Sequence, residues 1–284
     1  MLLKQLKNLK KNCLKFYKTL QKLTFFMKKR SKNFTFSLLL ALILSFVGGI
    51  LEAYSLTNRG FFALMQTGNL ISVFINLVKT DWNSLLVSFV VVFTFIVGLI
   101  ISNVIEFICE KKKKDYQPFE LMICVALLVL VIFIPVEYTS EEAILEAKDL
   151  SWPNVLGNIV LALIGSMLLE SFRKMNSKNY TSTMMTANLQ RMVSSFFIGE
   201  EKHDKNEIIS GFDYVLVILS FGVGVMISYG YFHLLKEFFA NNYSYWMEVI
   251  PNLILLVPIC ILIATLIGRY IYLRKKFNVA SVAQ

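Results

Sequence analysis

The chain alternates long apolar stretches with short charged connections. An α-helix rises about 1.5 Å per residue, so about 20 apolar residues are needed to cross the roughly 30 Å hydrocarbon core of a bilayer. Six stretches have about this length, at residues 36–56, 85–108, 119–136, 153–172, 212–235 and 249–273. The pattern therefore predicts an all-α, polytopic membrane protein with six transmembrane helices. The mean hydropathy of +0.60 agrees with this fold class.

Two shorter apolar segments each begin with a polar motif, one in either half of the chain. Residues 67–69 read Thr-Gly-Asn, and residues 186–188 read Thr-Ala-Asn. An acidic residue stands upstream of each motif: Glu52 comes 15 positions before the first threonine, and Glu170 comes 16 positions before the second. Duplicated membrane units that contain a polar break are a common plan for transporters and channels, so we interpret the two halves as an internal repeat.

The two motif segments are too short or too polar to cross the membrane as lipid-facing helices. Only nine residues, 70–78, continue the apolar run after the first motif, and the second run contains Gln190, Arg191, Ser194 and Ser195. Backbone that breaks at membrane depth must be buried in protein or line a watery cavity. We therefore expect two re-entrant or broken helices, each of which enters and leaves on one side of the membrane.

Charge sets the expected orientation, because loops rich in Lys and Arg face the cytoplasm. Residues 1–35 carry eleven Lys or Arg and no Asp or Glu, and further basic runs stand at 111–114 and 274–276. The loop at 137–152 carries five acidic residues against one lysine, so it is expected outside. Both termini are therefore predicted to be cytoplasmic in a multi-pass cell-membrane protein.

These signals divide the chain into a basic N-terminal arm (1–35), a first membrane repeat (36–136), an acidic external loop (137–152), a second membrane repeat (153–273) and a cytoplasmic tail (274–284). Because each repeat contains three crossings, the second repeat is expected to be inverted relative to the first. The alternative is eight crossings in two parallel repeats, in which both motif segments span the membrane.

The basic arm has a pattern of its own. Apolar residues recur at steps of three and four, with lysines between them, at Leu2, Leu6, Leu9, Cys13, Phe16, Leu20 and Leu23. This spacing favours an amphipathic helix that lies on anionic lipid headgroups. A partner-binding tail is the alternative, whereas nucleic-acid binding is disfavoured and a signal peptide would need an uninterrupted apolar run.

The motif residues define a candidate binding site. A helix that starts inside the bilayer presents unpaired N–H groups and the positive end of its dipole, which Asn and Thr side chains cap well. Two such starts that meet near the midplane would favour an anion or a dipolar solute, and capping without any solute is the alternative. The candidate substrate- or ion-binding residues are Glu52, Thr67, Gly68, Asn69, Glu170, Thr186, Asn188 and Arg191.

Ionisable residues inside apolar segments are functional candidates by default. Glu52 and Glu170 are candidates for proton coupling or cation binding, and Arg191 would meet an anionic substrate or neutralise a glutamate. Alternatively, each glutamate reaches headgroup water or pairs with Arg59, Arg173 or Arg191. The two lone histidines and four isolated cysteines form no metal motif, and no hydrolase or nucleotide-binding motif occurs, so we expect no enzyme activity, cofactor or metal.

The residues around both breaks resemble the YoaK-like family of bacterial inner-membrane proteins. In that family an acidic residue in the first span precedes a Met-Thr-Gly-Asn motif. Here Gly-x-x-Glu-Ala at 49–53 is followed by Met-Gln-Thr-Gly-Asn at 65–69. In the second half, Ser-Thr at 182–183 and Thr-Ala-Asn at 186–188 hold the corresponding places.

The sequence also departs from the family pattern. Gln66 stands where Met is usual, and Leu169-Glu170 replaces Gln-Asn, which would change the charge of a shared polar site. The family is one of unknown function. The resemblance therefore implies a bacterial inner-membrane protein and leaves the activity open.

Three functions are compatible with these features. The first is a secondary transporter or permease for a small polar solute, with polar half-helix starts near the bilayer midplane and Glu52 as the coupling site. The second is a passive channel with two re-entrant segments, and the third is a membrane scaffold or sensor that acts through the basic arm. The expected partners are the lipid bilayer, anionic headgroups at the arm and a small polar solute or ion, and an oligomer is compatible with the sequence.

Overall fold

The structure, a computed structural model, describes residues 36–137, 151–176, 178–239 and 250–282. The basic arm, residues 138–150 of the acidic loop and the last two residues lie outside the described ranges. The predictions made for the arm and for the acidic loop therefore stay predictions.

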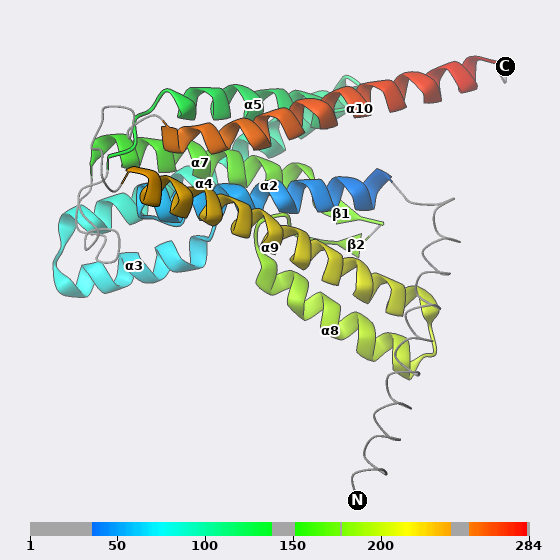
Figure 1. Cartoon of the computed structure of the whole chain (residues 1–284). Coiled ribbons are helices and arrows are strands. Elements are labelled where there is room, and N and C mark those ends of the chain that lie inside the picture. Colours follow the sequence, from blue (N-terminus) through cyan, green and yellow to red (C-terminus); the bar gives the residue numbers. More distant parts are fainter. Residues whose placement is uncertain (1–35, 138–150, 177, 240–249, 283–284) are drawn as a thin grey trace, which may run out of the picture.

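Helices form nearly all of the described chain (Figure 1). The first half contains α2 (Phe36–Arg59), α3 (Gln66–Lys79), α4 (Trp82–Lys111) and α5 (Gln117–Ile132). The second half contains α7 (Trp152–Ser171), α8 (Met185–Glu201), α9 (Lys205–Phe239), the 3-10 helix η2 (Ile250–Leu255) and α10 (Leu256–Val282). A two-stranded antiparallel hairpin, β1 (Lys174–Met175) and β2 (Lys178–Asn179), lies between α7 and α8 and was not predicted.

Five described helical segments are long and apolar enough to cross a membrane: α2, α4, α7, α9 and the segment from η2 into α10. Where the sequence predicts a sixth span at 119–136, the structure has the 16-residue apolar helix α5, which is about 24 Å long. The prediction of a helical, multi-pass membrane protein is therefore confirmed, with one predicted span shorter than expected. Helix α10 also continues to Val282, so most of the predicted tail is helical.

The two halves pack through helices that cross between them. Helix α2 makes its largest contact with α9, and α4 makes its largest contact with α7. Small residues allow both close approaches. A Cβ atom on Gly49 of α2 would lie 2.1 Å from the Phe221 carbonyl oxygen of α9, and one on Gly224 would lie 2.2 Å from the backbone of α2. A Cβ atom on Gly98 of α4 would lie 1.9 Å from the Ser166 Oγ of α7.

The segments before α3 and α8 each pack on a glycine inside another helix. Before α3, the side chain of Leu64 packs on Gly165 of α7, whose Cβ position would lie 2.5 Å from the Leu64 Cγ. Before α8, the Ser182 carbonyl oxygen lies 2.7 Å from the Cβ position of Gly48, near the middle of α2. In Figure 1, α3 runs from the centre of the molecule toward one end, and α8 runs from the centre toward the other.

A buried arginine fixes the end of α2. Arg59 is 1% exposed, and its guanidinium donates hydrogen bonds to the carbonyl oxygens of Ile134 (3.0 Å) and Pro153 (3.0 Å). Its Nε donates to the Tyr54 hydroxyl oxygen (3.0 Å), and that hydroxyl donates to Oδ1 of Asn252. Because a buried charge is stable only when its donors are satisfied, this network fastens the ends of α2 and α5 to the starts of α7 and η2.

We expect Gly224→Ala to destabilise the protein, because its Cβ would overlap the backbone of α2. Overpacking of this kind costs about 1–3 kcal/mol. The control is Gly222→Ala on the same helix, where a Cβ atom would meet nothing within 4 Å. Both changes alter helix propensity equally. A difference in melting temperature between the two detergent-purified variants therefore reports the close contact of α9 with α2. Equal melting temperatures for the two variants would contradict the close contact.

Candidate functional site

Glu52 holds the break before α3 in place. Its side chain is 5% exposed, and its carboxylate accepts hydrogen bonds from the backbone N–H groups of Leu64 (2.9 Å) and Met65 (3.2 Å). The Ser55 hydroxyl, one turn further along α2, accepts a hydrogen bond from the Ala63 N–H (3.2 Å). Side chains of α2 thereby satisfy three backbone donors of the non-helical segment. The carboxylate is bound to backbone N–H groups rather than to any arginine that the sequence suggested.

Asn69 and Asn188 each fasten a loop to the helix that follows it. Asn69 Nδ2 donates to the Phe62 carbonyl oxygen (2.6 Å), and Asn188 Nδ2 donates to the Thr181 carbonyl oxygen (2.6 Å), seven residues earlier in both cases. The Thr181 N–H also donates to Asn188 Oδ1 (3.0 Å). Neither α3 nor α8 has a side-chain hydrogen bond at its N-cap, so the predicted capping role is wrong. The same contact instead recurs in both halves.

The remaining motif residues are less enclosed than the asparagines. Thr67 and Thr186 are exposed, whereas Asn69 and Asn188 are buried. Gly68 is half-buried, and a Cβ atom there would lie 3.4 Å from the nearest atom of the Phe62 ring, so the backbone at this position does not require glycine. The structure therefore does not bring the threonines and the asparagines together on one buried surface.

Glu170 does not occupy the place in α7 that Glu52 occupies in α2. The contact of α2 with α9 lies at Gly49, three residues before Glu52, and the contact of α7 with α4 lies at Ser166, four residues before Glu170. One residue of difference turns a helical side chain by about 100°. Glu170 therefore does not point in the direction that Glu52 takes, and it pairs with Arg173 (2.9 Å).

An open cavity of about 590 Å³ lies beside the second break, and it is lined in part by Glu170, Arg173 and Arg191. Arg173 bridges Glu170 and Glu106, with 2.6 Å to the Glu106 carboxylate. Arg191 donates to Asn188 Oδ1 (3.5 Å). Partial burial opposes the charge on Arg173, but the Glu170 and Glu106 carboxylates together raise the pKa of Arg173 above its ordinary value. The predicted residues Glu170 and Arg191 thus share one site, while Glu52 and Asn69 belong to the other break.

A buried carboxyl group on α5 was missed by the sequence reasoning. Glu120 is 1% exposed; its Oε1 accepts from the Ser102 hydroxyl of α4 (2.7 Å), and its Oε2 has no hydrogen-bond partner among the described residues. Glu120 also lies within electrostatic range of Glu106 and Arg173. The sequence does show an acidic residue at the start of a predicted span. A residue at such a position ordinarily reaches headgroup water, so its burial was not expected.

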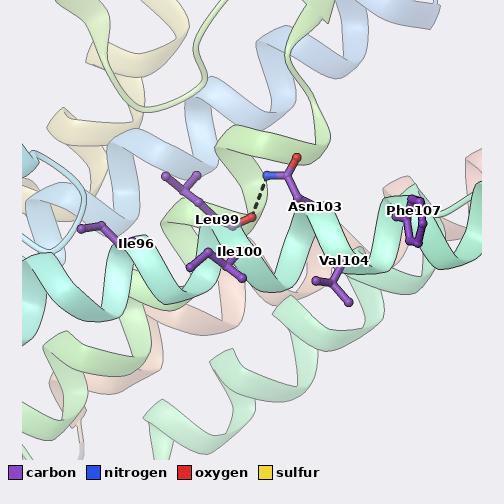
Figure 2. A pocket seen from close by; sticks show the side chains of 6 residues that line it. All are labelled: Ile96, Leu99, Ile100, Asn103, Val104 and Phe107. Carbon is purple, nitrogen blue, oxygen red and sulfur yellow. Dashed lines mark hydrogen bonds between the residues drawn. The ribbon is translucent and has the colours of Figure 1, made fainter.

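A second hollow, of about 560 Å³, lies on the outer face of α4 and is almost wholly apolar (Figure 2). Its lining residues are Ile96, Leu99, Ile100, Asn103, Val104 and Phe107. The Asn103 amide donates to the Leu99 carbonyl oxygen one turn earlier (2.8 Å), so the one polar side chain is satisfied within its own helix. An apolar outward face on a membrane-spanning helix is suited to lipid tails, and we place no polar-ligand site there.

The long apolar helices place this chain in the class of polytopic helical membrane proteins. Residues 40–257 match a family described as a protein of unknown function (DUF1275), and the chain belongs to this YoaK-like family. The match confirms the resemblance seen in the sequence and does not extend into the basic arm. No curated protein and no solved structure matches the chain.

We expect Glu52→Gln to lower the melting temperature in detergent. The glutamine keeps one acceptor oxygen but places an NH₂ group against a backbone N–H, and a lost buried hydrogen bond of this kind costs about 1–3 kcal/mol. Glu120→Gln is the matched control, because Oε2 of Glu120 has no partner to lose. If both variants melt like the wild type, Glu52 does not hold the break.

Proposed function

We propose that the two halves form an inverted repeat, each with three crossings and one re-entrant helix. Three observations support this arrangement. The contact of α2 with α9 corresponds to that of α7 with α4, the asparagine contact recurs in both halves, and each break packs on a glycine in the first helix of the other half. In the eight-crossing alternative, the 14-residue helix α3 would span the bilayer with a length of about 21 Å, well short of the hydrocarbon thickness.

We infer that the protein is a secondary transporter or permease for a small polar solute, and not an enzyme. One observation carries this proposal: the break before α3 is held by an ionisable side chain, Glu52. A protonated carboxyl group has one O–H donor, so one of its oxygens no longer accepts well from a backbone N–H. Proton binding would loosen the start of α3, and this links a proton to a structural change, as a proton-coupled carrier requires.

The polar cavity beside the second break is the proposed entrance for the solute. Arg173 and Arg191 line it, and the basic residues around it support a cytoplasmic location by the positive-inside rule. On this orientation both termini are cytoplasmic, in a bacterial inner membrane, and the acidic loop is external. The basic arm would rest on anionic headgroups.

Single-cysteine labelling tests the proposed topology. In a background without Cys13, Cys109, Cys124 and Cys260, a cysteine at Asn83 should react with a membrane-impermeant maleimide only from outside, and one at Lys205 only from the cytoplasm. Both positions are exposed, beyond the ends of α3 and α8. Labelling of Asn83→Cys from the cytoplasm would mean that α3 spans the membrane, which would contradict the inverted repeat.

Proteoliposomes loaded with a pH-sensitive dye test transport. Among small amino acids, carboxylates and halide salts, at least one solute should drive proton entry at a rate that saturates with its concentration. Glu52→Gln should abolish the proton signal at a temperature at which size exclusion shows folded protein, while Gly222→Ala should retain it. Flux that never saturates and survives Glu52→Gln would favour a channel. No flux, together with a cellular phenotype lost on deletion of residues 1–33, would favour a scaffold or sensor.

A further inference from the structure

Four buried hydroxyl groups near the second break have no hydrogen-bond partner among the described residues. They belong to Ser45 of α2 and to Tyr180, Ser182 and Thr183, which lie just before α8. The exposed fractions of these residues are 0%, 3%, 1% and 5%, respectively. Burial of an unpaired hydroxyl is unfavourable, and native proteins rarely gather several in one place without something that bonds to them.

The segment 180–183 packs on α2, the helix that carries Ser45. Tyr180 packs in the same apolar cluster as Ala41, and the Ser182 carbonyl oxygen presses on Gly48. Positions 41, 45 and 48 are four and three residues apart, so they lie on one face of α2. Ser45 therefore lies on the same face of α2 as Gly48, which this segment contacts.

The first break differs from the second in how its polar groups are satisfied. There, Glu52 and Ser55 accept from three backbone donors. At the place of α7 that corresponds to Glu52, three residues beyond the helix contact at Ser166, stands Leu169, which offers no acceptor. The second break thus has hydroxyl groups that lack a partner within the described part of the chain, where the first break has a hydrogen-bonded carboxylate.

We propose that a small anion binds among these hydroxyl groups at the start of α8. Helix α8 begins at Met185, and its first turn has neither an acidic residue nor a side-chain cap, so its unpaired N–H groups present positive potential. Ser, Thr and Tyr hydroxyl groups donate to an anion, and a tyrosine hydroxyl stays protonated at neutral pH.

The surroundings favour an anion over a cation. None of the four side chains is a carboxylate, and Glu170 of the neighbouring cavity is already paired with Arg173. Arg191, on the second turn of α8, adds a positive charge. The cavity lies next to the segment that carries these hydroxyl groups, since Tyr180 and Thr181 form part of its lining.

Salt-dependent thermal unfolding of the full-length protein in detergent tests this site. The probes are sodium chloride, sodium bromide, sodium nitrate and sodium formate, with sodium gluconate as a bulky-anion reference and N-methylglucamine chloride as a sodium-free one. We expect a saturable rise in melting temperature that follows the small anion, and equal values for the sodium and N-methylglucamine chlorides. Because binding is measured at equilibrium, this test is independent of whether the protein transports anything.

Two variants at the site and one control make the test specific. Ser45→Ala and Ser182→Ala should each weaken the apparent anion affinity by about tenfold or more, because each removes a donor to a charged partner. The control is Ser228→Ala, which removes another buried, unpartnered hydroxyl group on α9. The Ser220 hydroxyl of α9 donates to the Leu42 carbonyl oxygen of α2. Ser228 is two turns further along α9, so it lies past the level of Ser45 and away from the proposed site.

Three results would overturn the proposal. The first is stabilisation that follows sodium rather than the anion, which would indicate a cation site. The second is an anion effect that Ser228→Ala reduces as much as the two site variants do. The third is no difference among the salts together with a higher melting temperature for Ser45→Ala, which would mean that the hydroxyl groups are unpaired and bind nothing.

Discussion

A chain that stops being helical within a membrane must find hydrogen-bond partners for its backbone within the protein, because the lipid offers none. Here α2 supplies the partners of the first break, and Asn188 of α8 accepts from the backbone of the second. The segments before α3 and α8 can approach α7 and α2 only because these helices carry Gly165 and Gly48 where the loops press on them. Once the loops are there, Glu52 and Ser55 can satisfy the exposed N–H groups of the first segment.

The same constraint accounts for the packing of the two halves. Each break occupies the face of a first helix that belongs to the other half, so α2 and α7 are enclosed by elements from both halves. Helix α2 packs on α9, and α7 packs on α4, with Gly49 and Ser166 at the closest points. The Arg59 network then fixes the ends of α2, α5, α7 and η2 at one end of the molecule. The breaks therefore lie between helices whose ends are held together in another part of the molecule.

The two breaks share an architecture and differ in chemistry. The asparagine contact with a carbonyl seven residues earlier is the same in both, so it maintains the loop shape. Beyond it, the first break carries a buried carboxylate, and the second carries hydroxyl groups beside a cavity with two arginines. The proposed proton site therefore belongs to the first break and the proposed anion site to the second.

The apolar helices, the two polar breaks and the family could be predicted from the amino-acid sequence. These follow from hydropathy and spacing along short stretches of chain. The partner that each polar group meets depends instead on how distant helices pack. Glu52 binds the backbone of a loop and Glu170 does not, because one residue of register turns the side chain by about 100°. Glu120 and the four hydroxyl groups became evident only once helices from distant parts of the chain buried them, since burial depends on packing that no short stretch of sequence encodes.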